Sequence, residues 1–94
     1  MNVNFEWDED KTCENLKKHK ISFEEARTIF NDPFSITILN PQDSTDKYCF
    51  IDLGYSSKGQ LLVMVYTERG TSIRIISCRN ATKQERRLYK EERL

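Results

Sequence analysis

The pattern of apolar and polar residues begins with a short strand and a helix. In residues 4–8, two aromatic side chains alternate with polar neighbours, which predicts a strand with both rings on one face. A helix is predicted over residues 9–19, because Asp8 is a good N-cap and two acidic residues follow it in the first turn. Few apolar residues lie on this helix, and we expect Cys13 and Leu16 to form its inward side.

A second helix is predicted to begin after Ser22. The sequence Ser-Phe-Glu-Glu is a capping box, in which Ser22 caps the amide three residues on and Glu25 reaches back. The helix ends at Asp32, because the residue before a proline is pushed out of the helical region. The two helices are expected to form a hairpin joined at residues 20–21. The buried stripe of the second helix is predicted to consist of Ile21, Phe23, Ala26, Ile29 and Phe30.

Four strands and a last helix follow. Residues 61–66 are nearly all apolar, as expected of a central strand covered on both faces. A tight hairpin is predicted at residues 68–70, because Gly70 readily takes a positive φ. A second capping box at Thr82 begins a charged helix that is expected to end near Glu92. The other strands are predicted at residues 34–39, 47–55 and 72–78.

The order βααββββα predicts a single α+β domain over residues 1–94. The sheet is expected to be antiparallel and to be packed by the N-terminal helical hairpin and the C-terminal helix. A chain of 94 residues has room for one hydrophobic core only.

Composition and charge narrow the function classes. The chain holds 15 basic and 15 acidic residues, which argues against a simple nucleic-acid coat. Residues 79–94 nevertheless carry six basic against three acidic side chains. This basic tail is compatible with local phosphate binding and equally with a solvated helix face, and charge alone does not choose between them.

The cysteines and the hydropathy of the chain predict a cytoplasmic protein. Three cysteines at wide spacing with one histidine form neither a zinc motif nor a disulfide framework, so three buried, reduced thiols are expected. No stretch approaches the length of a membrane span, and the acidic first ten residues do not resemble an export signal. We therefore expect no membrane association.

The first helix carries the first candidate for chemistry. Lys11, Asn15 and His19 stand four residues apart and line one face, with Lys18 at its edge. Lysine and histidine side by side can bind a phosphate and exchange a proton near neutral pH. The alternative is that the last turn attracts cations simply because it is a helix C-terminus.

The last strand carries the second candidate. Alternation places Arg74 on the face opposite Ile73 and Ile75, and an arginine in an apolar strand needs a partner or a ligand. Glu68 and Asp52 are the expected structural partners. The functional alternative is phosphate binding, for which guanidinium groups are well suited. The arginines on or beside this strand are Arg69, Arg74 and Arg79.

Several enzyme classes are excluded by their missing motifs. The sequence contains no phosphate-binding glycine loop, no dinucleotide-binding G-x-G-x-x-G and no G-x-S-x-G nucleophile turn. The remaining Lys/His/Arg set, with a few acids, is what a metal-free ribonuclease needs. A base takes the proton from the 2′-hydroxyl, a cation stabilises the phosphate, and an acid protonates the leaving 5′-oxygen.

Ordered strings along nearly the whole chain resemble the BrnT toxin family. The opening strings are Phe5-Glu6-Trp7-Asp8, Lys11, Asn15-Leu16-x-Lys18-His19 and Ser22-Phe23-Glu24-Glu25-Ala26. The closing strings are Thr67-Glu68-Arg69, Ile73-Arg74-Ile75-Ile76-Ser77-x-Arg79, Ala81-Thr82 and Glu85-Arg86-x-x-Tyr89. Three positions depart from the family pattern: Lys20 replaces a common glycine, Thr12 an asparagine and Cys78 an alanine.

The resemblance implies a RelE-like, type II ribonuclease toxin without a cofactor. It also implies neutralisation by a BrnA-like antitoxin, whose ribbon-helix-helix domain would bind operator DNA on behalf of the complex. Two other classes stay open: a non-catalytic protein that only binds its antitoxin and co-represses the operon, and a toxin that blocks its target without cutting.

The family's polar signature positions give the expected site residues. As hypotheses, Lys11 or His19 moves the proton, Arg74 and Arg79 hold the phosphate, and Glu68 orients an arginine. Lys18 and Arg69 are expected to bind RNA. Trp7 is a further RNA-binding candidate by base stacking, although a tryptophan before a helix cap is also typical of the core.

Overall fold

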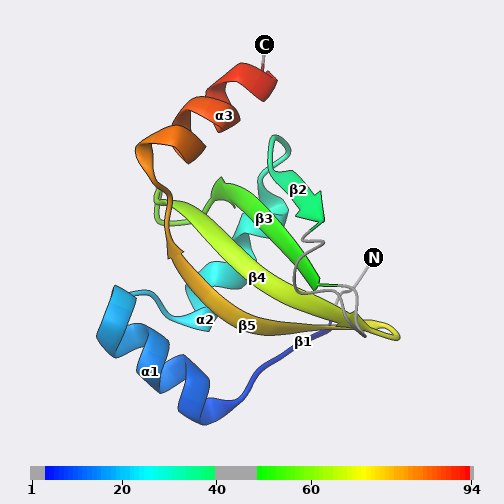
Figure 1. Cartoon of the computed structure of the whole chain (residues 1–94). Helices are drawn as coiled ribbons and strands as arrows, with labels where there is room; N and C mark the ends of the chain where they lie inside the picture. The colour runs from blue at the N-terminus through cyan, green and yellow to red at the C-terminus, as the bar shows by residue number, and fades with distance from the viewer. Residues whose placement is uncertain (1–3, 40–48, 94) are drawn as a thin grey trace.

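A five-stranded sheet with helices on both faces forms the molecule (Figure 1). The structure is a computed structural model that describes residues 4–39 and 49–93, so the first two residues of the predicted 47–55 strand lie outside the described part. The strands lie in the order β1-β5-β4-β3-β2. The elements are β1 (Asn4–Glu6), α1 (Glu9–His19), α2 (Phe23–Ala26), the 3₁₀ helix η1 (Arg27–Asn31), β2 (Ile36–Leu39), β3 (Cys49–Tyr55), β4 (Leu61–Arg69), β5 (Ser72–Asn80) and α3 (Lys83–Arg93).

The sheet is mixed rather than antiparallel throughout, which corrects the prediction. β1 pairs with β5 in parallel, with Phe5 opposite Ile73 and Glu6 opposite Arg74. The other three pairings are antiparallel. A short turn between two strands indicates that they are antiparallel. β1 and its partner β5 are instead separated in the chain by helices and three other strands, so no local pattern indicates their relative direction. The predicted second helix also differs, because only its first four residues are α-helical before the chain tightens into η1.

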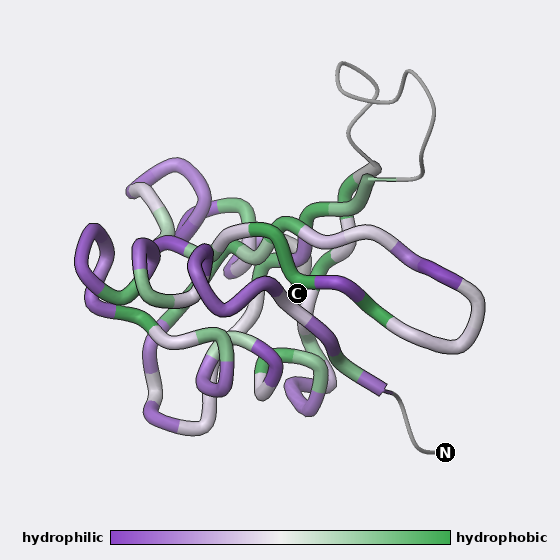
Figure 2. The backbone as a smooth tube through the Cα atoms, turned by 90° about the horizontal axis from the view of Figure 1, so that it is seen from below, coloured by the Kyte–Doolittle hydropathy of each residue, from purple (hydrophilic) through white to green (hydrophobic). Residues whose placement is uncertain are grey.

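The central strand β4 is buried on both faces, as its apolar sequence predicted. Leu62, Met64 and Tyr66 pack under α2 and η1. On the opposite face, Leu61 and Val63 pack against Tyr89 of α3. The strands therefore carry much of the apolar sequence, while polar residues concentrate on the helices and turns (Figure 2).

Helix α1 is attached to the edge of β5 by a polar side chain. Asn15 is buried, its Oδ1 accepts from the Cys78 backbone N–H at 3.1 Å, and its Nδ2 donates to the Ile21 carbonyl at 3.0 Å. The prediction that Cys13 and Leu16 face inward is wrong, because Cys13 is exposed and Leu16 is 49% exposed. The physical reason is that α1 covers a strand edge, whose backbone groups require hydrogen-bond partners rather than apolar contact.

The predicted N-caps are formed at the start of the first two helices. Asp8 accepts from the Asp10 amide, and Ser22 accepts from the Glu25 amide. The Glu25 carboxylate does not complete its capping box, since it accepts instead from the Ser56 hydroxyl at 2.7 Å. Lys20 ends α1 with a φ of 63°, the left-handed conformation that glycine adopts at less cost.

The cysteines are free thiols, and two of the three are buried. Burial raises the pKa of Cys78 to about 12, so this thiol stays protonated. The expectation of three buried thiols is wrong for Cys13, which lies on the outer side of α1. No helix in the described part of the chain is long and apolar enough to span a membrane.

Replacing Asn15 by alanine should lower the free energy of unfolding by about 2–3 kcal/mol, because the Cys78 amide and the Ile21 carbonyl lose their partner. Urea denaturation measures the loss. Lys17→Ala, an exposed change on the same helix, is the control and should change stability by less than about 0.5 kcal/mol. Equal effects of the two substitutions would contradict a role for Asn15 in attaching α1.

Candidate functional site

Two adjoining hollows lie between α1 and the β4–β5 part of the sheet. The first, which we call the His19 hollow, has a volume of about 230 Å³ and is lined by Lys11, Glu14, Asn15, Lys18, His19, Ile76 and Ser77. The second, the Arg74 hollow, has a volume of about 340 Å³ and is lined by Lys11, Thr67, Arg69, Arg74 and Ile76. Because Lys11 and Ile76 line both, the two hollows form one α1–β5 groove.

The groove exists because β1 is short. β1 pairs with β5 only as far as Arg74, and α1 returns to the β5 edge at Cys78 through Asn15. Between Arg74 and Cys78, the edge of β5 is paired neither with β1 nor with the Asn15 amide. Residues Ile76 and Ser77 lie in this interval and line the His19 hollow.

A β-bulge lies in the same interval. The register of β4 and β5 steps from Tyr66–Ile75 to Val65–Ser77, so Ile76 is the extra residue. Ile75 and Cys78 are both buried in the α2-side core, although unbroken alternation would put them on opposite faces. The bulge therefore places Arg74 and Ser77 on the face away from this core while Ile76 is directed to the groove.

The four candidates on α1 line one hollow, as their spacing predicted. Lys11, Asn15 and His19 follow one another at every fourth residue, and Lys18 joins them. Asn15 lies at the buried base of this row, His19 is half-buried and the two lysines are exposed. The sequence did not assign Glu14, which also lines the His19 hollow and is the only carboxylate among the described residues that line it.

A carboxylate from β1 holds the two arginines of the Arg74 hollow. Glu6 lies 3.7 Å from the guanidinium groups of both Arg69 and Arg74. All three side chains are more than a third exposed, so each ion pair contributes at most about 1 kcal/mol and exchanges readily for another anion. Sequence reasoning missed this role of Glu6, although its alternation with Phe5 in β1 puts it on the Arg74 face.

The two carboxylates expected beside Arg74 lie on the other face of the sheet. Glu68 is opposite Ile73 and Asp52 opposite Met64, and both partners belong to the α2 side. Asp52 accepts a hydrogen bond from the Tyr66 hydroxyl at 3.0 Å. Burial raises the pKa of Asp52. Burial, together with the charge and hydrogen bond of Asp52, raises the pKa of Tyr66. The expected pairing of Arg74 with Glu68 or Asp52 is therefore wrong.

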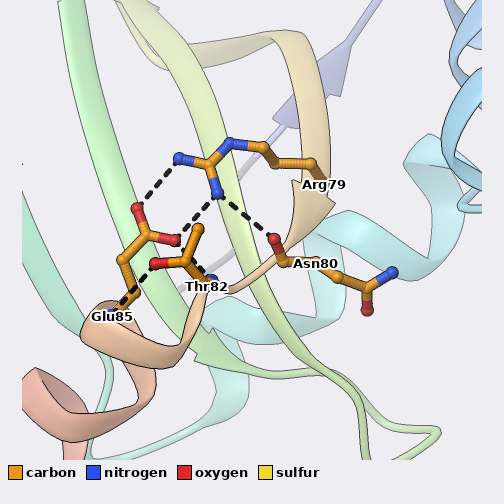
Figure 3. Close-up of polar contacts among 4 residues, drawn as sticks. All are labelled: Arg79, Asn80, Thr82 and Glu85. Atoms are coloured by element: carbon orange, nitrogen blue, oxygen red, sulfur yellow. Dashed lines mark hydrogen bonds and ion pairs between the residues drawn. The ribbon is translucent and has the colours of Figure 1, made fainter.

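Arg79 stands outside the groove and fastens the start of α3 (Figure 3). Its guanidinium donates to both Glu85 oxygens, at 2.8 and 2.9 Å, and to the Asn80 carbonyl at 3.2 Å. Glu85 in turn accepts from the Thr82 amide, and Thr82 accepts from the Glu85 amide, so the second predicted capping box is complete. Arg79 is thus a structural clamp in the free chain.

Trp7 is not among the residues that line the groove. Its indole packs edge-on against Phe23 with ring centroids 6.1 Å apart, and it borders the α2-side core. This placement fits the core alternative for Trp7 better than base stacking. Thr67 is a further groove residue that the sequence analysis did not assign, and its alternation with Arg69 along β4 is the signal that locates it.

The groove is cationic, and its side chains are suited to binding an anion. Lys11, Lys18, Arg69 and Arg74 face it, against the carboxylates of Glu6 and Glu14. Within the described residues, no three His, Cys, Asp or Glu side chains are grouped so as to hold a metal ion. The arrangement can bind phosphate through its cations, and it brings one imidazole to the same surface.

Comparison with known proteins identifies the class to which this chain belongs. A family model described as the ribonuclease toxin BrnT of type II toxin–antitoxin systems matches residues 7–85. The crystal structure of the ribonuclease toxin BrnT of Brucella abortus superposes with a TM-score of 0.68 at 18% identity, covering 87% of this chain and all of that one. No curated protein matches the chain significantly.

The class is therefore that of small type II toxins, and the shared α+β fold is that of a solved toxin structure. The chain belongs to the BrnT family of ribonuclease toxins, as the ordered strings in its sequence implied.

The Arg79–Glu85 clamp should make the free energy of unfolding depend on pH in the acid range. The Arg79 hydrogen bonds lower the pKa of Glu85 from 4.5 to about 2. A carboxyl whose pKa falls on folding stabilises the fold above its unfolded pKa, and this contribution disappears as the pH falls through the folded pKa. Both side chains are partly exposed, so we expect Glu85→Gln to cost about 1 kcal/mol at pH 7.

The measurement is urea denaturation of both proteins between pH 7 and pH 2. The difference between wild type and Glu85→Gln should shrink from pH 4.5 downward. Glu91→Gln on the exposed side of α3 is the matched control and should show little difference at any pH. A pH-independent difference for Glu85→Gln would refute the clamp as an ionic interaction.

Proposed function

We propose that this chain is a metal-independent endoribonuclease whose active site is the α1–β5 groove. The observation that carries the proposal is convergence: Lys11, Lys18 and His19 of α1 line the same groove as Arg69 and Arg74 of the sheet. Family membership supports RNA as the substrate, because the family is named for ribonuclease toxins.

The reaction that fits these groups is cleavage by the neighbouring 2′-hydroxyl. Lys11 or His19 takes the proton from the 2′-hydroxyl, whose oxygen attacks the phosphorus. The 5′-oxygen leaves and receives a proton from the other of these two groups, which gives a 2′,3′-cyclic phosphate and a free 5′-hydroxyl. Arg74 and Arg69 stabilise the negative charge on the phosphate, after exchanging Glu6 for the substrate.

The cations of the groove supply the charge that a metal ion would otherwise supply. Lys11, Arg69 and Arg74 line the hollow proposed for the phosphate, and Lys18 lines the adjoining hollow. Guanidinium groups bind phosphate oxygens in pairs and lose no proton at physiological pH. Protein side chains alone can therefore supply each role in the cleavage.

The proposed partner is a BrnA-like antitoxin with a ribbon-helix-helix domain. A type II antitoxin is a protein that binds its toxin, and covering the α1–β5 groove would exclude RNA directly. The antitoxin, not this chain, would contact operator DNA, and both proteins would act in the cytoplasm. Binding to the folded state would also stabilise α1 by mass action.

Expression of the chain in bacteria tests the activity. The wild type should arrest growth and fragment RNA, and co-expression of the protein encoded by the adjacent gene should relieve the arrest. His19→Ala and Arg74→Ala should each reduce RNA cleavage by about 100-fold or more, the usual loss for a proton-transfer group or a charge-stabilising donor.

Arg87→Ala is the matched control, because Arg87 is an exposed arginine on α3 outside the groove. It should cleave like wild type. Intact RNA after expression of the folded wild-type chain would overturn the enzyme proposal in favour of a toxin that acts by binding alone.

A chelator tests the assignment to side chains. Cleavage of a purified RNA by the isolated toxin should keep its rate in excess EDTA, because each role is given to a protein group. A loss of activity that is restored by added Mg²⁺ or Mn²⁺ would refute metal independence. It would not contradict the proposal that the active site is the α1–β5 groove.

A further inference from the structure

The face of the sheet that carries α3 is covered by that helix at one end only. α3 lies beyond the end of the sheet rather than along it, and its Tyr89 packs on Leu53, Leu61 and Val63 (Figure 1). Among the described residues, this face holds a cluster of four buried hydrophobic residues, against nine on the α2 side. The α3 side is therefore the thinner half of the core, and α3 leaves the middle of this face open.

A row of aliphatic side chains crosses this middle part of the face. Ile38 of β2 is paired with Ile51 of β3, and Ile51 with Val65 of β4. Ile38 is 39% exposed, and Ile51 and Val65 are half-buried. Val65 is also the one residue among the first seven of β4 that is not buried. We call these three residues the Ile38–Val65 row.

The row leads directly to the cationic groove. Ser77 is paired with Val65 and lines the His19 hollow. Arg74 is paired with Thr67, which lies two residues beyond Val65 on β4 and therefore on the same face. The anion that meets the arginines of the Arg74 hollow in the free chain is Glu6, and its ion pairs are exposed and weak. An apolar strip thus adjoins cations that can exchange their partner.

This combination suits a protein segment. Single-stranded nucleic acids bind by stacking their bases on aromatic side chains, whereas this row is aliphatic. Protein interfaces instead join an apolar centre to a polar or charged rim. A second copy of this chain, docked through the same surface, would bring a second set of the same cations to the interface. Charge complementarity therefore favours an acidic partner over a second copy.

The direction of the row favours a helix. Neighbouring strands lie about 4.8 Å apart, so the row spans about 10 Å from Ile38 to Val65. Residues seven apart in a helix are separated by about 10.5 Å along its axis. A helix that crosses the strands can therefore place one apolar stripe along the whole row. A strand added to the open edge of β2 would run along β2 and would meet only Ile38 of the row.

We propose that the Ile38–Val65 row and the Arg74 hollow together bind one acidic, amphipathic helix of the antitoxin. Apolar side chains of this helix cover the row, and a carboxylate about one turn further on replaces Glu6 on the two arginines. Such a helix would occupy the Arg74 hollow and so exclude RNA. The inference rests on the proposed function, in which an antitoxin covers the groove, and it adds the surface and the chemistry by which that partner is bound.

Isothermal titration calorimetry with the protein encoded by the adjacent gene tests the surface. Ile38→Glu should weaken its binding to the toxin at least ten-fold, because a carboxylate then faces the apolar side of an acidic helix. Leu16→Glu is the matched control: Leu16 is 49% exposed on α1 and is not part of the row, so this variant should bind like wild type. Unchanged affinity of Ile38→Glu, or no binding by the wild type, would overturn the inference.

Thiol labelling locates the partner without a charged substitution. An Ile38→Cys toxin is treated with a maleimide before and after saturation with the same protein, and labelling at position 38 should slow at least ten-fold in the complex. Cys13, which is exposed on the outer side of α1, is the internal control and should keep its rate. Labelling at position 38 that the partner leaves unchanged would contradict docking on the row.

RNA cleavage by Ile38→Glu separates this inference from the proposed function. Ile38 does not line the groove, so the variant should cleave RNA at the wild-type rate while escaping neutralisation. A loss of cleavage at an unchanged melting temperature would assign the row to RNA binding and overturn the inference. A wild-type chain that cleaves no RNA, but binds its partner through the row, would refute the enzyme and keep the docking surface.

Discussion

The position of helix α1 depends on one buried amide, and the groove depends on that helix. Asn15 accepts from Cys78 on the β5 edge and donates to Ile21 at the start of the following segment. Two hydrogen bonds in a buried site are directional, so they fix both the height and the rotation of α1 against the sheet. Apolar packing alone would leave the rotation free, since the apolar residues Cys13 and Leu16 face away.

A second constraint acts on the sheet. β1 ends at Glu6, and the β-bulge at Ile76 follows at once on its neighbour β5. The short strand leaves part of an edge open, and the bulge changes which β5 side chains meet that opening. Glu6 meanwhile keeps Arg69 and Arg74 together in the free protein. Fold and candidate site thus share residues, because this small domain divides its buried residues into two clusters, one on each face of the sheet, rather than the one core expected from its length.

The residues expected to work together separate into two groups in the structure. Lys11, Lys18, His19, Arg69 and Arg74 line the groove, whereas Trp7, Glu68 and Arg79 lie elsewhere. Trp7 borders the core, Glu68 lies on the opposite face, and Arg79 bonds Glu85 at the start of α3. Each of the three is charged or aromatic and belongs to a motif that resembles the family, so the sequence alone does not distinguish a structural role from a functional one. The contacts that each side chain makes across the fold distinguish them.

The sequence by itself determined what depends on near neighbours. The caps at Asp8, Ser22 and Thr82, the row of Lys11, Asn15 and His19, and the doubly buried β4 follow from spacings of two to eight residues. Only the tertiary structure decided the parallel pairing of β1, the bulge at Ile76 and the partner of Arg74. These join residues that lie more than sixty positions apart or depend on a register that two strands set together, and no local pattern encodes either.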